Sequence, residues 1–185
     1  MQAARGASLS ASSDTDTVPQ PEEPRAAGNR RLWLFAAVVV ATYAADVVSK
    51  VVAVDRLTGQ PDVVVIPGVL QLHLTRNPGA AFSVATGMTV LLTLVAAGVA
   101  IAVVRIAARL RDRTWAVALG LLLGGALGNL TDRLLREPGP LRGHVVDFLQ
   151  LPHWPVFNLA DSAIVAAAAL ILVQSLRGVG VDGRG

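Results

Sequence analysis

Residues 32–54 read LWLFAAVVVATYAADVVSKVVAV, an apolar run whose charged residues are Asp46 and Lys50. At about 1.5 Å of rise per residue, a helix of this length crosses a hydrocarbon core about 30 Å thick. Arg30 and Arg31 precede the run, so a cleaved secretory signal of twin-arginine type is an alternative interpretation. Further apolar runs follow, and they favour a first transmembrane helix that is retained.

Three more apolar runs, at residues 87–104, 114–131 and 157–176, are each long enough to cross a bilayer. The 185-residue chain is 53% hydrophobic and 16% charged, which is too apolar for an ordinary soluble domain of this size. The sequence therefore predicts an all-α membrane protein with four transmembrane helices.

The flanking segments predict the domain limits and the orientation. Residues 1–29 are rich in Ser, Ala, Pro and acidic residues, and we expect a disordered cytoplasmic tail there. Residues 30–177 would form the membrane domain, with a second short tail at 178–185. Ten of the sixteen basic residues lie within residues 1–31, 105–113 and 177–185. Cytoplasmic loops carry the excess of Lys and Arg, so both termini should be cytoplasmic, and this placement of arginines does not suggest a nucleic-acid partner.

A small β element is expected between the first two helices, over residues 62–76. Residues 62–66 are mostly β-branched, Pro67 and Gly68 suit a turn, and apolar and polar residues then alternate from Leu70 to Thr75. We expect this element on the outer membrane surface. The second outer connection, residues 134–155, contains Asp147 and carries Trp154, which suits a membrane interface.

Polar groups from four distant segments converge on the outer half of the predicted bundle, where each is costly and requires a reason. Asp46 and Lys50 are spaced to pair on one helix face. A structural ion pair, with Lys50 extending toward the interface, is the simpler interpretation of that pair. The full set is Asp46, Lys50, Asn77, Asn129, Asp132, Arg133, Asp147, Asn158 and Asp161.

The third run contains two patterns with helical spacing. Asn129, Asp132 and Arg133 share a face, and the adjacent Asp132 and Arg133 are expected to neutralise each other. Glycines recur at four-residue intervals, which would let a neighbouring helix approach closely. These glycines, at positions 120, 124 and 128, indicate packing rather than chemistry.

Asp147 and Asp161 suggest acid–base chemistry. Asp161 falls in the first turn of the last helix, three residues after Asn158, where helix amides stabilise an ionised carboxylate. Asp147 lies in the apolar VVDF, where its pKa would rise, so the two could share one proton and activate water. Alternatives remain: a helix cap for Asp161, an interfacial loop residue for Asp147, or a proton relay formed by both.

No metal or other cofactor is expected. The chain has no cysteine and no HExxH motif, and His73, His144 and His153 lack the spacing of metal ligands. 

Five motifs occur in an order that resembles lipoprotein signal peptidase, also called signal peptidase II. The resemblance covers roughly residues 32–176. The motifs are AADVVSK (44–50), RNPGAAFS (76–83), GGALGNLTDRL (124–134), GHVVDF (143–148) and FNLADS (157–162).

The resemblance implies a four-helix membrane aspartic endopeptidase with a small extracytoplasmic β-cradle. By motif, Asp147 and Asp161 match the catalytic pair. The positions that match the family's supporting residues are Asp46, Lys50, Asn77, Gly79, Gly128, Asn129, Arg133, Asn158 and Ala160.

The family resemblance also implies the substrate and the cellular location. Such an enzyme removes signal peptides from bacterial prolipoproteins in the plasma membrane, cleaving before the diacylglyceryl-modified cysteine, and is inhibited by globomycin. Prolipoproteins and membrane lipid are the expected partners, and a monomer is expected. The small Gly79, Ala80 and Ala81 should let a substrate backbone approach closely, and a bulky residue at Ala80 should impair cleavage. The loop at 134–142 is longer than usual for the family.

Two other functions remain open on the residues alone. Buried acids also serve small ion- or proton-coupled carriers, and a non-catalytic assembly factor is a weaker alternative. 

Overall fold

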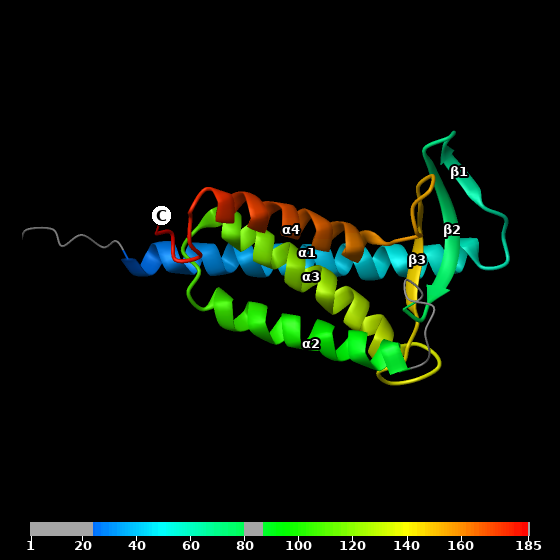
Figure 1. Ribbon diagram of the computed structural model, residues 1–185, viewed down its shortest axis with the longest axis horizontal. Helices are drawn as coiled ribbons and strands as arrows, with labels where there is room; N and C mark the ends of the chain where they lie inside the picture. The colour runs from blue at the N-terminus through cyan, green and yellow to red at the C-terminus, as the bar shows by residue number, and fades with distance from the viewer. Residues whose placement is uncertain (1–23, 80–86, 185) are drawn as a thin grey trace, which may run out of the picture.

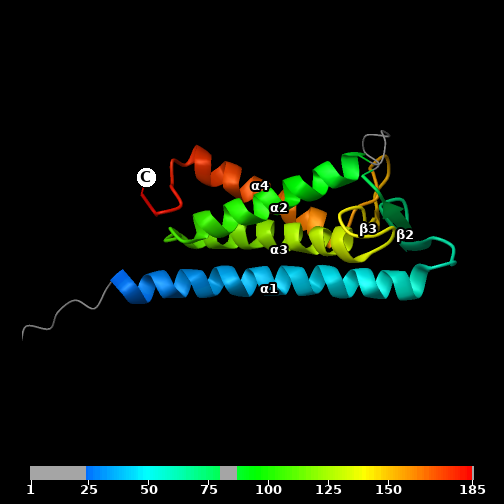
Figure 2. The ribbon, with the colours of Figure 1, turned by 90° about the horizontal axis from the view of Figure 1, so that it is seen from below.

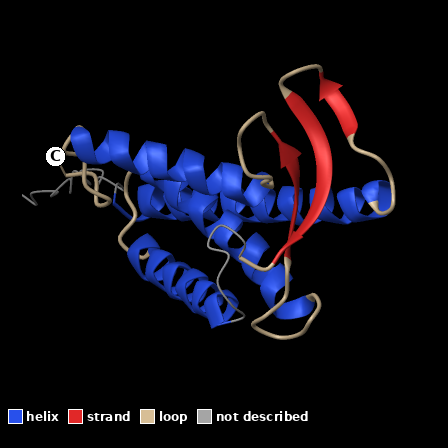
Figure 3. Ribbon diagram, turned by 45° about the vertical axis from the view of Figure 1, so that its right-hand side comes forward, coloured by secondary structure: helices blue, strands red, loops and turns tan. Residues whose placement is uncertain are grey.

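A computed structural model of the chain describes residues 24–79 and 87–184, with side chains described for 30–79 and 89–184. Four helices run alongside one another, and a three-stranded sheet covers one end of them (Figures 1 and 3). The elements in order are α1 (Pro24–Leu57), β1 (Val63–Ile66), β2 (Leu70–Asn77), α2 (Gly87–Ala107), α3 (Arg113–Leu135), β3 (Val145–Gln150) and α4 (Leu159–Leu176).

All four helices are long and apolar enough to cross a membrane, as the sequence predicts. The candidate spans are Arg30–Leu57, Thr89–Ala107, Arg113–Leu135 and Leu159–Leu176. Helix α3 lies between α1 on one side and α2 and α4 on the other (Figure 2). Since α3 packs against all three neighbours, it is the helix around which the bundle is built.

Helix α1 begins at Pro24, inside the segment that the sequence predicts as a tail extending to residue 29. Proline suits the first position of a helix because its missing N–H would have no helical partner there. Adding residues to an existing helix also costs little compared with starting one. Residues 1–23, which hold most of the expected tail, lie outside the described part of the chain.

The glycine stripe of α3 faces α1, which confirms that it serves close helix packing. A Cβ on Gly124 would come within 2.9 Å of the Val39 carbonyl oxygen and 2.7 Å of the Thr42 Cβ. A Cβ on Gly120 would lie 2.8 Å from the Val38 Cβ. Only a residue without a side chain allows this separation of the two backbones.

The sheet has the order β1-β2-β3, with both pairs antiparallel. Strands β1 and β2 form the predicted hairpin between α1 and α2, whereas β3 was not predicted from the sequence. Residues 145–148 are all buried, so β3 has no alternation of apolar and polar residues. Val146 and Phe148 pack on Ala53 and Leu57 of α1, which joins the sheet to the bundle.

The opposite end of the bundle is closed by the segment after α4. The indole Nε1 of Trp115 donates to the Val179 carbonyl at 2.9 Å, and the Arg111 N–H donates to the Val181 carbonyl at 3.0 Å. Buried Gln174 donates to Asp112, the N-cap of α3. These bonds connect the last described residues to the α2–α3 connection, far from the sheet (Figure 1).

Candidate active site

Asp147 and Asp161 are brought together through one residue, Asn158. Asp147 lies on β3, and Asp161 lies in the first turn of α4. The Asn158 Nδ2 donates to Asp147 Oδ1 at 2.6 Å, while Asn158 and Asp161 form a reciprocal capping box. Asp161 therefore takes part in capping α4, and the N-cap residue, Asn158, also binds the carboxylate of Asp147.

Three asparagines donate side-chain N–H groups to the two carboxylates. Asn77 donates to Asp147 Oδ2 at 2.9 Å, and Asn129 donates to Asp161 Oδ1 at 2.8 Å. Together with the bond from Asn158, these bonds give Asp147 an amide donor on each oxygen. Asp161 Oδ2 accepts from the Asn158 backbone N–H at 3.2 Å.

The orientation of each side-chain amide is determined by a donor on its oxygen. Oδ1 of Asn77 accepts from the Gly79 N–H at 2.8 Å, and Oδ1 of Asn158 accepts from the Asp161 N–H at 2.9 Å. Oδ1 of Asn129 accepts from the Lys50 ammonium at 2.8 Å. An amide oxygen can only accept, so it faces the donor in each case. The Nδ2 of the same amide is thereby directed to a carboxylate.

Burial, with a smaller contribution from the negative charge of Asp161, raises the pKa of Asp147 to about 6, against the lowering effect of the hydrogen bonds from Asn77 and Asn158. The side chain is 2% exposed. A carboxyl group with this pKa exchanges a proton near neutral pH, as general acid–base catalysis requires. 

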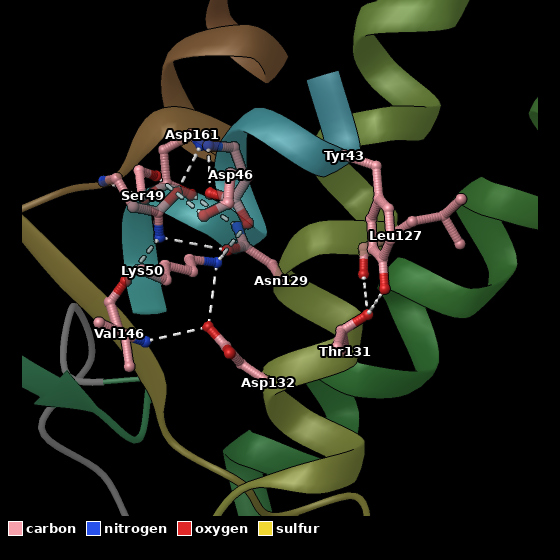
Figure 4. Close-up of polar contacts among 12 residues, drawn as sticks. Tyr43, Asp46, Ser49, Lys50, Leu127, Asn129, Thr131, Asp132, Val146 and Asp161 are labelled. Carbon is pink, nitrogen blue, oxygen red and sulfur yellow. Dashed lines mark hydrogen bonds and ion pairs between the residues drawn. The ribbon is translucent and has the colours of Figure 1, made fainter. Parts of the chain in front are cut away.

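Lys50 lies at the centre of a buried ionic cluster (Figure 4). Its Nζ is 2.8 Å from Asp46 Oδ2 and 3.0 Å from Asp132 Oδ2. The predicted pairing with Asp46 is confirmed, but Lys50 is 1% exposed and does not extend toward the interface. Two carboxylates and the Asn129 oxygen satisfy its three N–H groups inside the protein.

The expected pairing of Asp132 with Arg133 is wrong. Asp132 instead binds Lys50, the Arg136 Nε and the Val146 backbone N–H. Adjacent residues of a helix point in different directions, so they do not face each other, whereas Arg136 lies one turn further on. The sequence placed Asp132 among the polar groups that support the site but assigned it the wrong arginine; the signal for the observed partner was the four-residue spacing to Arg136.

Arg133 is buried near the two aspartates and interacts electrostatically with Asp147, Asp161 and Asp132. Its Nη1 has no hydrogen-bond partner within the described residues. A buried guanidinium N–H without a partner is costly, so this atom is suited to an acceptor that the described residues do not supply.

The small residues at the site also have structural reasons. A Cβ at Gly128 would collide with the Asp46 carboxylate, and Gly79 has a φ of +111°, in the left-handed region that favours glycine. Ala160 is fully buried and donates its N–H to Asp46 at 2.9 Å. Ala80 and Ala81, expected to admit the substrate backbone, lie outside the described residues.

Membrane-spanning helices around a buried group of carboxylates and amides define a polytopic membrane enzyme of the aspartic peptidase type. Residues 38–177 match the family model described as signal peptidase (SPase) II. The chain therefore belongs to the signal peptidase II family. 

Relatives and solved structures agree with this assignment. A lipoprotein signal peptidase from Rhodococcus jostii (strain RHA1) is 56% identical over 156 residues, covering 83% of this chain and 77% of that protein. One from Mycobacterium avium (strain 104) is 50% identical over 167 residues, covering 90% and 88%. A solved bacterial membrane enzyme has a TM-score of 0.66 at 28% identity, covering 80% of this chain and 93% of that one.

Proposed function

We propose that Asp147 and Asp161 are the catalytic pair with which this protein removes signal peptides from prolipoproteins. The observation that carries the proposal is that both carboxylates accept hydrogen bonds from Asn158, Asp147 from its side chain and Asp161 from its backbone N–H, with two further amide donors beside them. Family membership does not support the alternative of a small ion carrier.

The mechanism follows from the shared environment of the two acids. One carboxylate takes a proton from the attacking water, and the other carboxyl group donates a proton to the oxygen of the scissile carbonyl. The amide donors of Asn77 and Asn158 stabilise ionised Asp147, while burial opposes its ionisation. Because both carboxyl groups can take either role, acid and base are not assigned to one residue each.

Arg133 is proposed to bind the substrate backbone. The guanidinium interacts electrostatically with both aspartates, and a peptide carbonyl would satisfy its Nη1, which has no hydrogen-bond partner in the part of the chain that the structure describes. The other matched residues, Asp46, Lys50, Gly128 and Ala160, contact one another rather than open space, and we assign them supporting roles.

The proposed location is the bacterial plasma membrane, with both termini cytoplasmic and the site toward the extracytoplasmic side. The excess of arginine near the termini and residues 105–113 supports this orientation. Cleavage before the diacylglyceryl-modified cysteine fits a site within a membrane protein, because a lipidated substrate can arrive laterally from the bilayer. A monomer suffices, since one chain supplies the whole proposed site.

The test uses purified protein in lipid and a lipidated prolipoprotein peptide. Asp147→Asn and Asp161→Asn should each abolish cleavage while leaving the protein folded. Asp55→Asn is the matched control, because Asp55 is an exposed acid on α1 that pairs with Arg56. Normal cleavage by either site variant would refute the catalytic pair.

Two further arms test the finer assignments. The same peptide without its diacylglyceryl group should be cleaved poorly, and globomycin should inhibit the wild-type enzyme. Equal cleavage of the lipidated and unlipidated peptides would contradict the proposed substrate class, while the catalytic pair could still be judged from the variants.

A further inference from the structure

We infer that Lys50 determines the separation of the two catalytic aspartates by joining two carboxylates that each hold the backbone beside one of them. Lys50, Asp46 and Asp132 are called the lysine bridge below. The inference rests on the proposed function of Asp147 and Asp161, and it makes the members of the bridge positioning residues rather than catalytic ones.

One arm of the bridge reaches Asp161. Asp46 Oδ2 lies 2.8 Å from the Lys50 ammonium, and the other oxygen of Asp46 accepts from the Ala160 N–H at 2.9 Å. Ala160 directly precedes Asp161. Asp46 and Lys50, the other two residues of this arm, are 0% and 1% exposed. A carboxylate of α1 thus holds the first turn of α4 by its backbone.

The other arm reaches Asp147 in the same way. Asp132 Oδ2 lies 3.0 Å from the Lys50 ammonium and accepts from the Val146 N–H at 3.1 Å. Val146 directly precedes Asp147. Each catalytic residue therefore follows a residue whose N–H is bound by a carboxylate, and both carboxylates bind the same lysine (Figure 4).

The edge of β3 explains why Asp132 is needed. Strand β3 pairs with β2 along one edge. Along its other edge, the described residues form a single β-bridge, between Leu149 and Phe157. At Val146 side chains complete that edge: Asp132 accepts from its N–H, and Asn158 Nδ2 lies 3.4 Å from its carbonyl. The backbone next to Asp147 is thus held by side chains of α3 and of the α4 N-terminus.

Lys50 is the group that makes the two arms compatible. Asp46 and Asp132 are 0% and 3% exposed, and two negative charges so close together would repel if no cation lay between them. Lys50 is also the only lysine in the sequence. Bonds to charged groups are stronger than neutral ones, so the bridge should resist relative movement of β3 and α4.

Hydrogen exchange in lipid nanodiscs provides a readout that does not depend on activity. Lys50→Met should accelerate exchange at both the Val146 and the Ala160 amides by about tenfold or more, although Lys50 bonds to neither. Asp132→Asn should affect Val146 alone, and Asp46→Asn should affect Ala160 alone. Tyr43→Phe is the control, since it removes a different α1–α3 contact, the 3.2 Å bond to Thr131.

Kinetics on the lipidated peptide supply the second readout. In Lys50→Met, kcat should fall about 100-fold with KM within about twofold of wild type, because a small misplacement of reacting groups costs about that much. Lys50→Arg, which keeps the charge, should restore part of kcat.

Each outcome decides the matter. Unchanged exchange at Val146 and Ala160 in folded Lys50→Met would overturn the inference, and a loss of kcat in that case would instead point to the Lys50–Asn129 bond. If Lys50→Met does not fold, the charge-balanced Lys50→Met/Asp132→Asn variant replaces it, and protection of both amides there would equally overturn it. Failure of the catalytic pair would appear separately, as cleavage by Asp147→Asn.

Discussion

At the scale of single residues, Asn158 has two functions in one side chain. It is the N-cap of α4, and its amide holds Asp147. The motif FNLAD pointed to Asn158 and Asp161 because cap spacing is local and is visible in a sequence. The contact with Asp147 could not be predicted in this way, because it depends on where β3 lies relative to α4.

Asn158→Ala should reduce both stability and catalysis. Loss of an N-cap costs about 1 kcal/mol, and Asp147 would also lose a hydrogen-bond donor, so we expect a lower Tm and a kcat reduced at least about tenfold. The matched control is Asp112→Ala, which removes the N-cap of α3 at the opposite end of the bundle. It should lower Tm without changing kcat; a similar loss of kcat in both variants would contradict the dual function.

Asp147 should make stability depend on pH in a direction opposite to that of most acids. Its pKa is raised from 3.8 to about 6, so between these two pH values the folded protein keeps a proton that the unfolded chain releases. The stabilisation from this group is therefore present below about pH 4 and is lost as pH rises through about 6, by up to about 3 kcal/mol. Relative to Asp147→Asn, the wild-type Tm should fall between pH 4 and pH 8; parallel Tm curves would refute this.

At the scale of elements, the helices and the first hairpin could be predicted, but β3 could not. Apolar runs and period-two alternation depend only on local sequence. Residues 145–148 of β3 are buried on both faces, so VVDF carries no alternation to recognise. The partners of Asp132 could not be predicted either, because Lys50 and Val146 belong to two other elements, α1 and β3.

The contact between α1 and α3 gives a prediction about glycine. Gly124→Ala should destabilise the protein, because its Cβ would lie 2.7 Å from the Thr42 Cβ and 2.9 Å from the Val39 carbonyl oxygen. Overpacking of this kind costs about 1–3 kcal/mol, which should appear as a lower Tm in lipid or detergent. The matched control, Gly98→Ala on α2, has nothing within 4 Å and should leave Tm unchanged or slightly higher. Equal Tm values for both variants would contradict this account of the stripe.

At the scale of the whole molecule, the sheet lies at one end of the bundle, and the start of α1 and the described residues after α4 lie at the other (Figure 1). Since the chain has no cysteine, each introduced cysteine is a unique label. In intact bacterial cells a membrane-impermeant maleimide should label Gln60→Cys, beside the sheet, but not Asp182→Cys, near the C-terminus. Permeabilised cells should show labelling of both. Labelling of Asp182→Cys in intact cells would reverse the proposed orientation.

The length of α1 has a consequence for the substrate. If Arg30 marks the inner boundary of the hydrocarbon, Asp46 lies about 24 Å of helix rise beyond it, which is a few ångströms short of a core about 30 Å thick. A signal peptide that crosses as a helix would still have its carbonyls bonded internally at that depth. The helix must unwind near the scissile bond, and an unwound backbone in the hydrocarbon core needs new hydrogen-bond partners. Arg133 Nη1, which has no hydrogen-bond partner among the described residues, would supply one such partner, so the enzyme would help to unwind the peptide as well as to hydrolyse it.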